Sequence, residues 1–228
     1  MSTVEVRTLE ALTAAAESEW LERFTAGPTE PEGFGLASGT AAPDLVLADH
    51  TEANRSLSEF WTDQPVLLMF WRHFGCGCGF DRAKRLLEEC PVYEAAGLRP
   101  VIVGQGEPAR AAAYRDQLGL PCPMLCDPDH DAYRAYGIGH WPVERVLYDA
   151  PGEFWAHPHD LGASLQDERR AGGRPLVDDP WRATAEFVIG TDGSVRLSHL
   201  YQYCEDFPEP LVLIAAARLA ENGALPGT

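Results

Sequence analysis

Apolar residues along the chain fall into two patterns, short continuous runs and helical periodicities. The runs "QPVLLMFWR" (64–72) and "LRPVIVGQG" (98–106) have the length of strands that are buried on both faces of a sheet. The segments "GFDRAKRLLEEC" (79–90) and "EPARAAAYRDQLG" (107–119) repeat their apolar residues at helical spacing. Pro108 near the start of the second segment and Gly119 past its end match the usual helix boundaries.

Further elements extend this alternation on both sides. We expect strands at 42–50 and 122–127, a short helix at 129–139, an antiparallel hairpin at 185–203 around "TDGS", and a closing helix from 208. Strands that alternate with helices predict an α/β fold with parallel strands and right-handed crossovers.

Two segments lie outside this core. Residues 4–25 predict an N-terminal helix, followed by a Gly- and Pro-rich linker. We therefore divide the chain into an N-terminal helix and linker at 1–38 and a core domain at 39–228, with an inserted helix and loops at about 150–181.

The charge and the cysteine content narrow the function. A net charge of −17 argues against a nucleic-acid face and against docking on an anionic membrane. No stretch has the roughly 18 apolar residues of a membrane span, and the acidic N-terminus lacks the pattern of a signal peptide. We expect a cytoplasmic protein whose six cysteines serve redox or metal chemistry. A single lysine, Lys84, with much Ala, Gly and Pro is typical of a GC-rich bacterial genome.

Two cysteines stand at the joint between the first buried strand and its helix. Cys76 and Cys78 lie in "HFGCGCGF", where the unpaired N–H groups of a helix N-terminus favour a thiolate. Arg72 and His73 precede them and could add positive charge. The glycines on both sides allow positive φ angles and a close approach of substrate. Two adjacent thiols also permit a relay in which one attacks and the other resolves the sulfenic acid.

Four segments resemble one known family in the same order along the chain. These are "GTAAPDLVLADH", "PVLLMFWRHFGCGC", "PCPMLCDPDHDAYRAYGI" and "AEFVIGTDGSVR". They resemble the AhpC/TSA-like peroxiredoxins over roughly residues 39–220. The resemblance implies a thioredoxin-like fold, with a central mixed sheet flanked by helices, and a thiol-dependent oxidoreductase that needs no cofactor. It also implies a small peroxide or disulfide as substrate and a thioredoxin-like or low-molecular-weight thiol as reductant.

The resemblance also assigns roles to residues. Cys76 matches the first cysteine of the F-G-C-x-x-C subgroup and would attack, whereas Gly79 occupies the place of the second, so that Cys78 becomes the resolving thiol. Thr184 stands at the spacing of the family arginine, and Arg182 lies two residues earlier as a supporting residue.

Two further functions remain open from the sequence. Cys126 and Cys204 are additional thiols, and one of Cys126, Cys204 or His73 could join Cys76 and Cys78 around a metal ion or an iron–sulfur cluster. Alternatively, the chain is a non-peroxidase redoxin of a biosynthetic pathway, with the insert as a lid over a small molecule. The lid residues would be Trp155, His157, His159 and Trp181. The insert could equally be a solvated decoration or the contact of a homodimer.

Overall fold

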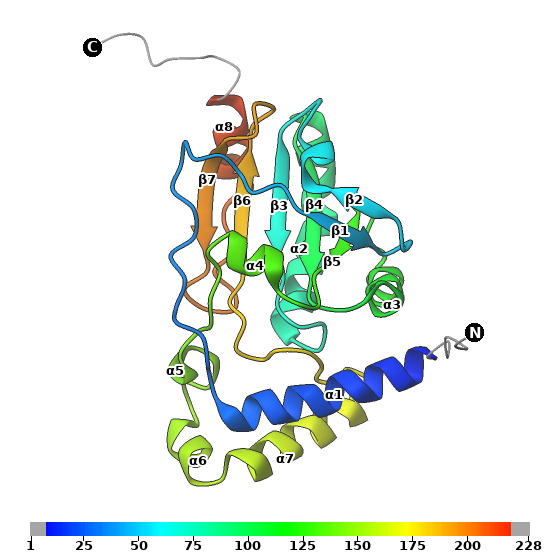
Figure 1. The fold of residues 1–228 in the computed structure, drawn as a ribbon, viewed down its shortest axis with the longest axis vertical. Coiled ribbons are helices and arrows are strands. Elements are labelled where there is room, and N and C mark those ends of the chain that lie inside the picture. The colour runs from blue at the N-terminus through cyan, green and yellow to red at the C-terminus, as the bar shows by residue number, and fades with distance from the viewer. Residues whose placement is uncertain (1–7, 220–228) are drawn as a thin grey trace, which may run out of the picture.

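A seven-stranded mixed sheet forms the centre of the computed structural model, which describes residues 8–219 (Figure 1). The strand order is β2-β1-β5-β4-β3-β6-β7. The strands are β1 Val46–Asp49, β2 Asn54–Ser56, β3 Val66–Phe70, β4 Arg99–Gly104, β5 Met124–Cys126, β6 Ala185–Ile189 and β7 Val195–Leu200. The helices are α1 Leu9–Ala26, α2 Gly77–Ala95, α3 Pro108–Leu118, α4 Asp131–Ala135, α5 Val143–Val146, α6 Pro151–Ala156, α7 Pro158–Ala171 and α8 Pro210–Leu219, with a 3-10 turn, η1, at Leu57–Phe60.

The central strand β3 is apolar on both faces because both faces are covered. Leu67 and Met69 join the hydrophobic core beneath α2, α3 and α8. Leu68 and Phe70 point to the opposite face and pack with residues of α4 and η1. β3, β4 and β5 run parallel, whereas β6 pairs antiparallel with β3 and with β7. The predicted alternation of parallel strands with helices, and the closing hairpin, are therefore confirmed.

Outside the central sheet, several observed elements differ from the predicted ones. The N-terminal helix is present as α1, while its predicted first residues, 4–7, lie outside the described part of the chain. The insert contains two helices, α6 and α7, where one was expected. Three short elements, β2, η1 and α5, were not predicted, because each has only three or four residues and too little periodicity to detect.

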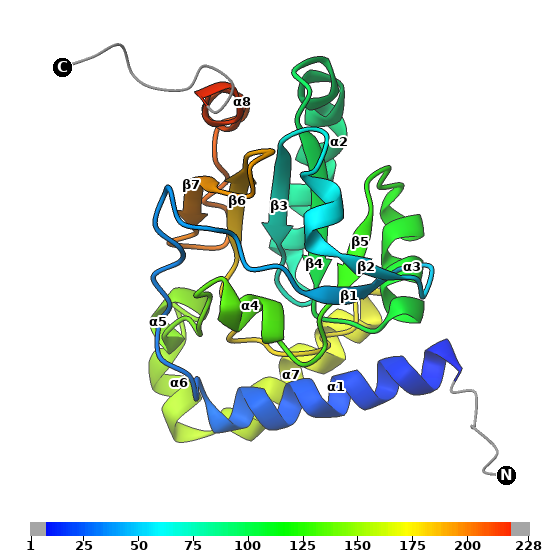
Figure 2. The same cartoon turned by 45° about the horizontal axis from the view of Figure 1, so that its top comes forward.

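The N-terminal helix and the insert pack against each other. α1 and α7 lie side by side beneath one end of the sheet (Figures 1 and 2). Gly162 of α7 makes this close contact possible, because a Cβ there would lie 2.7 Å from the Phe24 ring. Phe24 also stacks on Trp181, which is fully buried. The two segments that flank the core domain in the sequence therefore form a second hydrophobic cluster.

The predicted lid over a small molecule is not formed. Trp155 and His159 are exposed, as is His157. Trp181 is buried and donates its indole N–H to the carbonyl of Arg23 at 2.8 Å. These four side chains therefore do not face a common cavity. In the part of the chain that the structure covers, 8–219, no helix is both long and apolar enough to cross a bilayer.

The insert ends in an extended segment, residues 172–184, that connects α7 to β6 and is called the strap below. The strap passes over the turn between β3 and α2. Its Pro175 carbonyl and Leu176 backbone lie so close to Gly75 that a Cβ there would come within 2.2 Å and 2.8 Å of them. The strap therefore fits against the turn only because residue 75 has no side chain.

This contact predicts that Gly75→Ala destabilises the protein. The added methyl would meet backbone atoms, so the strap must shift, at a cost of about 1–3 kcal/mol. Gly152→Ala is the matched control, because it has open space around its Cβ position and lies in α6. It should leave the free energy of unfolding unchanged or raise it by up to about 1 kcal/mol. Urea denaturation measures both, and equal stability of the two variants would contradict the described contact.

Candidate active site

The turn after β3 places two thiols at the start of α2. The Cys76 N–H donates to the carbonyl of His73 at 3.1 Å, which closes the turn. Cys76 is the N-cap residue of α2, with extended backbone (φ −67°, ψ 132°), and Cys78 lies in the first helical turn. The Cys76 side chain does not cap the helix, so its sulfur is free for chemistry. As the sequence predicted, both thiols lie at the positive end of the helix dipole.

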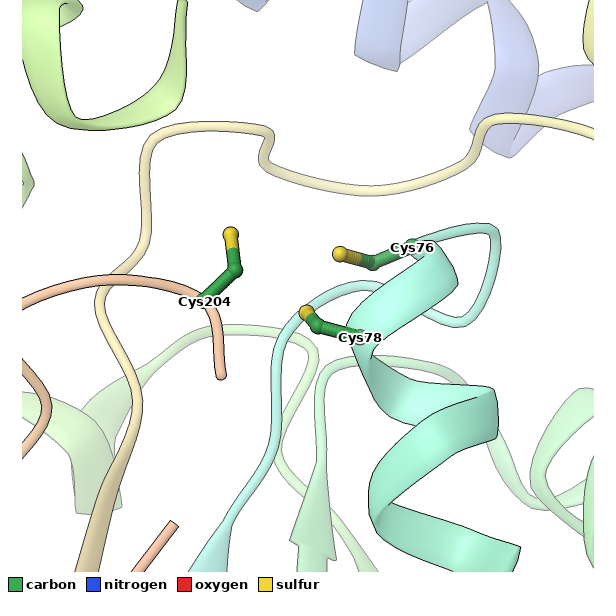
Figure 3. Close-up of side chains that lie close together, drawn as sticks. All are labelled: Cys76, Cys78 and Cys204. Atoms are coloured by element: carbon green, nitrogen blue, oxygen red, sulfur yellow. The ribbon is translucent and has the colours of Figure 1, made fainter. Parts of the chain in front are cut away.

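A third thiol comes from the far end of the chain. Cys204 follows β7 in an irregular loop, and its sulfur and those of Cys76 and Cys78 all lie within 4.8 Å of one another. Figure 3 shows the three side chains converging beneath the strap, from two separate elements. Cys76 and Cys204 are partly buried, whereas Cys78 is buried. The structure thus brings together both predicted catalytic thiols and one of the two additional candidates.

Arg72 is the charged residue of this site. Its side chain is buried and lies over the Trp141 ring, with 4.9 Å between Cζ and the ring centroid. It donates one hydrogen bond, from Nη2 to the Pro180 carbonyl at 2.6 Å, while Nε and Nη1 are buried and have no hydrogen-bond partner. Among residues 8–219, no carboxylate lies within 4.0 Å of this guanidinium. The nearby groups that can carry the balancing negative charge are the thiols.

The three thiols have different pKa values, with that of Cys76 lowered and those of Cys78 and Cys204 raised. Hydrogen bonds from the Cys204 and Cys78 thiols, together with the charge of Arg72, hold the pKa of Cys76 well below its usual range. The pKa values of the other two thiols move in the opposite direction. Hydrogen bonds with Cys204 and with Cys76 raise the pKa of Cys78 well above its usual range, and the hydrogen bond to Cys76 raises the pKa of Cys204 to about 11. Cys76 is therefore the thiolate and its two neighbours are thiols.

The same charges act on Arg72. Burial alone would lower its pKa, but electrostatic attraction to the neighbouring sulfurs of Cys204, Cys76 and Cys78 outweighs burial and raises it. Arg72 therefore keeps its charge in the buried site, as predicted.

His73 does not supply positive charge, contrary to the expectation from the sequence. Burial lowers the pKa of His73 to about 4, so its imidazole is neutral near pH 7. The ring lies against Trp20 of α1, with 6.4 Å between the ring centroids. His73 therefore packs the turn against the N-terminal helix and leaves the charge to Arg72.

The glycines around the thiols serve packing. Gly75, Gly77 and Gly79 all have negative or extended φ angles, so the positive φ expected from the sequence is absent. A Cβ at Gly79 would lie 2.8 Å from the Tyr114 hydroxyl, which explains the absence of a side chain there. At Gly77 the nearest atom is 3.8 Å away, so this position is open.

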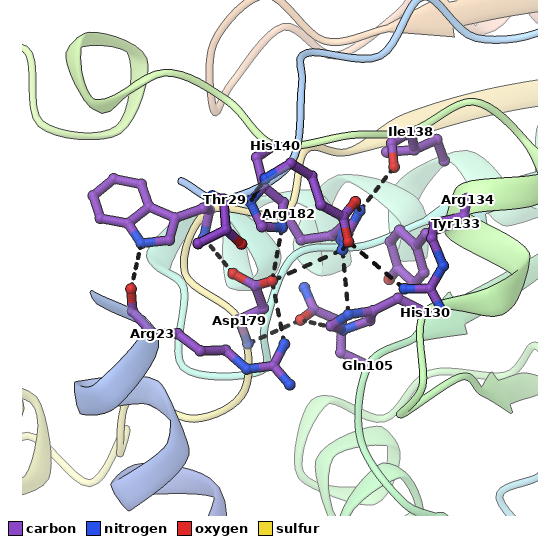
Figure 4. Close-up of polar contacts among 12 residues, drawn as sticks. Arg23, Thr29, Gln105, His130, Tyr133, Arg134, Ile138, His140, Asp179 and Arg182 are labelled. Carbon is purple, nitrogen blue, oxygen red and sulfur yellow. Dashed lines mark hydrogen bonds and ion pairs between the residues drawn. The ribbon is translucent and has the colours of Figure 1, made fainter. Parts of the chain in front are cut away.

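Arg182 is buried and lies in a polar network with His130, Ile138 and Asp179 (Figure 4). Its guanidinium forms a double hydrogen bond with Glu30, at 2.5 and 2.7 Å, and a bond with the Ile138 carbonyl at 3.0 Å. These hydrogen bonds direct the Arg182 guanidinium toward Glu30 and the Ile138 carbonyl. Thr184 does not replace it, because its hydroxyl donates to the Phe70 carbonyl at 2.5 Å.

The network fixes the strap segment that holds Arg72. Asp179 lies 3.0 Å from His140 Nε2 and accepts from Arg23 Nη1 at 3.2 Å. His140 Nδ1 accepts two backbone N–H bonds, from Thr29 and Glu30, which fixes its tautomer. Because Asp179 adjoins Pro180, the network positions the carbonyl that accepts from Arg72. Arg182 thus supports the site through the strap.

The remaining cysteines lie outside the cluster. Cys126 is buried at the end of β5, two strands away from β3, and burial raises its pKa to about 12. Neighbouring strands are about 4.8 Å apart, which places it beyond reach of Cys76. Cys122 is buried and Cys90 is partly buried against the same core, so both pack as hydrophobic residues.

A small hollow adjoins the thiols. Its volume is about 10 Å³, and it is bordered by Arg72, Cys78, Cys204 and the aromatic rings of Trp71 and Phe207, among others. A space of this size holds about one water molecule.

The three sulfurs could also hold one soft metal ion, since Zn²⁺ and Cu⁺ bind thiolates. This set of donor atoms includes Cys204 and excludes Cys126.

Sequence comparisons identify the family that the chain matches. Residues 38–198 match the AhpC/TSA family. The chain is 32% identical over 105 residues to the thioredoxin-like protein AAED1 of Arabidopsis thaliana, which covers 45% of this chain and 42% of that protein. It is 29% identical over 118 residues to the thiol-disulfide oxidoreductase ResA of Geobacillus thermodenitrificans, covering 51% of this chain and 66% of ResA. The chain thus spans less than two thirds of the length of these relatives.

Solved structures show the same fold. Peroxidoxin BcpB from Mycobacterium tuberculosis superposes with a TM-score of 0.57 at 16% identity, covering 81% of this chain and 97% of BcpB. A thiol peroxidase from Chromobacterium violaceum gives a TM-score of 0.52 at 18% identity, covering 84% and 90%. The predicted thioredoxin-like fold is confirmed.

Proposed function

The chain belongs to the AhpC/TSA family, and from this premise we propose that it is a thiol peroxidase whose attacking residue is Cys76. One observation carries the proposal. A buried arginine without a carboxylate partner lies beside three sulfurs, one of which stands at a helix N-terminus. This arrangement favours the thiolate of Cys76, the reactive form of cysteine.

The reaction follows from the thiolate. Cys76 attacks one oxygen of a hydroperoxide, an S–O bond forms, the O–O bond breaks, and the leaving alkoxide or hydroxide takes up a proton. Cys76 becomes a sulfenic acid and the peroxide is reduced to an alcohol or water. Arg72 stays protonated throughout and can stabilise the negative charge that develops on the leaving oxygen. The sulfenic acid is then within reach of two thiols, Cys78, the resolving thiol expected from the sequence, and Cys204.

The surroundings of Cys76 favour a small oxidant, because the strap covers the thiols (Figure 3). The hollow of about 10 Å³ borders Cys78 and Cys204, the neighbours of Cys76, and holds one group of the size of a water molecule. The disulfide of a folded protein would need the strap to move aside. Electrons would return from a thioredoxin-like protein or a low-molecular-weight thiol, and a reducing compartment such as the cytoplasm would keep the three thiols ready.

We predict that Cys76→Ser reduces peroxide turnover, with a thiol reductant in excess, to the uncatalysed background. Serine lacks a thiolate, so the attacking group is lost. Cys90→Ser is the matched control on the same helix and should keep turnover within about twofold, because a packed thiol away from the site is inert. Stopped-flow peroxide consumption measures both. Turnover that persists in Cys76→Ser would end the proposal.

The cluster of three sulfurs favours a second candidate, a protein that binds a soft metal ion through Cys76, Cys78 and Cys204. Three thiolates around a divalent ion carry one net negative charge, which Arg72 would balance. Iron–sulfur clusters commonly take four cysteines, and the described chain gathers three here, so a single zinc-like ion fits this donor set better.

This candidate predicts that protein purified anaerobically without chelator holds close to one Zn²⁺ per chain. Cys204→Ser, which removes one of the three sulfurs, should lower the metal content by more than half, while Cys90→Ser should not. Elemental analysis by mass spectrometry measures the zinc content per chain in wild type and in both variants. Wild-type protein that is free of metal and does not bind added Zn²⁺ or Cd²⁺ would eliminate this candidate and leave the peroxidase.

A further inference from the structure

The position of Cys204 identifies a second reacting thiol. We propose that Cys204, and not Cys78, resolves the Cys76 sulfenic acid, so that the oxidised protein carries a Cys76–Cys204 disulfide between the start of α2 and the loop after β7. The inference rests on the proposed function, because it presupposes that Cys76 is oxidised first. It identifies which of the two neighbouring thiols, Cys78 or Cys204, forms the disulfide with Cys76.

Distance permits either pairing. The sulfurs lie within 4.8 Å of each other, and a disulfide bond is about 2.05 Å long, so the atoms close a gap of less than about 3 Å. A rotation about the side-chain torsions, aided by a small shift of one loop, covers such a gap. The choice between the thiols therefore depends on backbone constraint and on access.

Backbone constraint disfavours Cys78. One residue separates Cys76 from Cys78, so a bond between them would close a ring of only three residues, which strains the geometry of a disulfide. The Gly79 N–H donates to the Cys76 carbonyl at 3.2 Å, so this ring would distort the hydrogen-bonded first turn of α2. Cys204 is free of such a constraint, because residues 201–209 form bends and turns without a helix or strand.

The Cys204 loop is anchored at its base and not at the thiol. Asp206 accepts from the Gln202 N–H at 2.9 Å, and its carbonyl lies 2.8 Å from His199 Nε2. These contacts close a short turn around Cys204 and leave its side chain free to rotate toward Cys76. The loop therefore presents the thiol at a fixed place without restricting its torsion.

Access also favours Cys204. A reductant must attack one sulfur of the disulfide, so at least one sulfur has to be reachable from solvent. Cys76 and Cys204 are both partly exposed, whereas Cys78 is buried, with 7% of its surface accessible. A Cys76–Cys204 disulfide thus joins the two more exposed cysteines of the cluster. Cys78 keeps a different task, that of donating its S–H to the Cys76 thiolate.

The step is balanced by atoms and electrons. The Cys204 thiol loses its proton and attacks the Cys76 sulfur, the S–S bond forms, the S–O bond breaks, and hydroxide leaves with the proton as water. An external dithiol then reduces the disulfide by two exchange reactions and is itself oxidised. Peroxide therefore gains two electrons from the dithiol in each cycle.

The two pairings differ in their effect on stability. A Cys76–Cys204 bond closes a loop of 129 residues, whereas Cys76–Cys78 closes three. Chain-entropy stabilisation grows with the logarithm of loop length, which makes the long loop about three times as effective. Oxidation should therefore raise the thermal midpoint by about 10 °C or more for the Cys204 pairing, against roughly 3–5 °C for the Cys78 pairing.

The test treats full-length wild type, Cys78→Ser, Cys204→Ser and the control Cys90→Ser with one equivalent of hydrogen peroxide. Non-reducing peptide mapping and the thermal midpoint are then measured. We expect the Cys76–Cys204 disulfide and its large thermal shift in all but Cys204→Ser. In Cys204→Ser, the Cys76 sulfenic acid should accumulate and be trapped by dimedone in most molecules.

Contrary results distinguish a failure of the role of Cys204 from a failure of the proposed peroxidase function. A Cys76–Cys78 peptide in oxidised wild type, or a disulfide that forms in Cys204→Ser as fast as in wild type, overturns the role of Cys204 while the peroxidase stands. Sulfenic acid that accumulates equally in wild type and Cys204→Ser would also overturn the role of Cys204 and leave the peroxidase standing. Cys76 that takes no oxygen in any variant refutes the proposed function and this inference with it.

Discussion

A guanidinium that is buried without a carboxylate partner is the constraint on which this site depends. Arginine cannot shed its proton within a protein, so the charge of Arg72 must be balanced or cost several kcal/mol. The sulfurs beside it are the groups that can supply a negative charge. One of them, Cys76, is the N-cap residue of α2 and receives two thiol hydrogen bonds. The buried cation therefore favours one ionised sulfur, and these hydrogen bonds select Cys76 as the cysteine that is ionised and reacts.

The rest of the molecule serves to keep that guanidinium in place. The Pro180 carbonyl belongs to the strap, and the strap is fixed by the ion pairs and hydrogen bonds of Asp179 with residues of α1 and the loop before α5. α1 in turn packs on α7 of the insert. Segments that flank or interrupt the core domain in the sequence thus hold the strap over the thiols (Figure 3). Through α1, the insert and the strap, the fold of the family encloses a site with three thiols.

The sequence predicts what depends on local pattern and misses what depends on long-range contact. The apolar run of β3 and the thiols at the start of α2 follow from neighbouring residues, and both were recognised. Arg72 was recognised too, because it adjoins Cys76 in the chain. Its partners Trp141 and Pro180 were not, since they lie 69 and 108 residues away and carry no motif. Cys126 was considered equal to Cys204, because strand order decides between them and spacing does not reveal it.

The dependence of Cys76 on Arg72 is tested most directly by peptide-resolved alkylation of Cys76 as a function of pH, in Arg72→Met and Arg72→Lys beside the wild type. The account predicts a wild-type Cys76 pKa clearly below the roughly 8.5 of a free thiol. Arg72→Met should raise it by about one unit or more, and Arg72→Lys, which keeps the charge, by less. A wild-type pKa at or above the free value, or the same pKa in Arg72→Met, would contradict the claim that the buried guanidinium creates the thiolate.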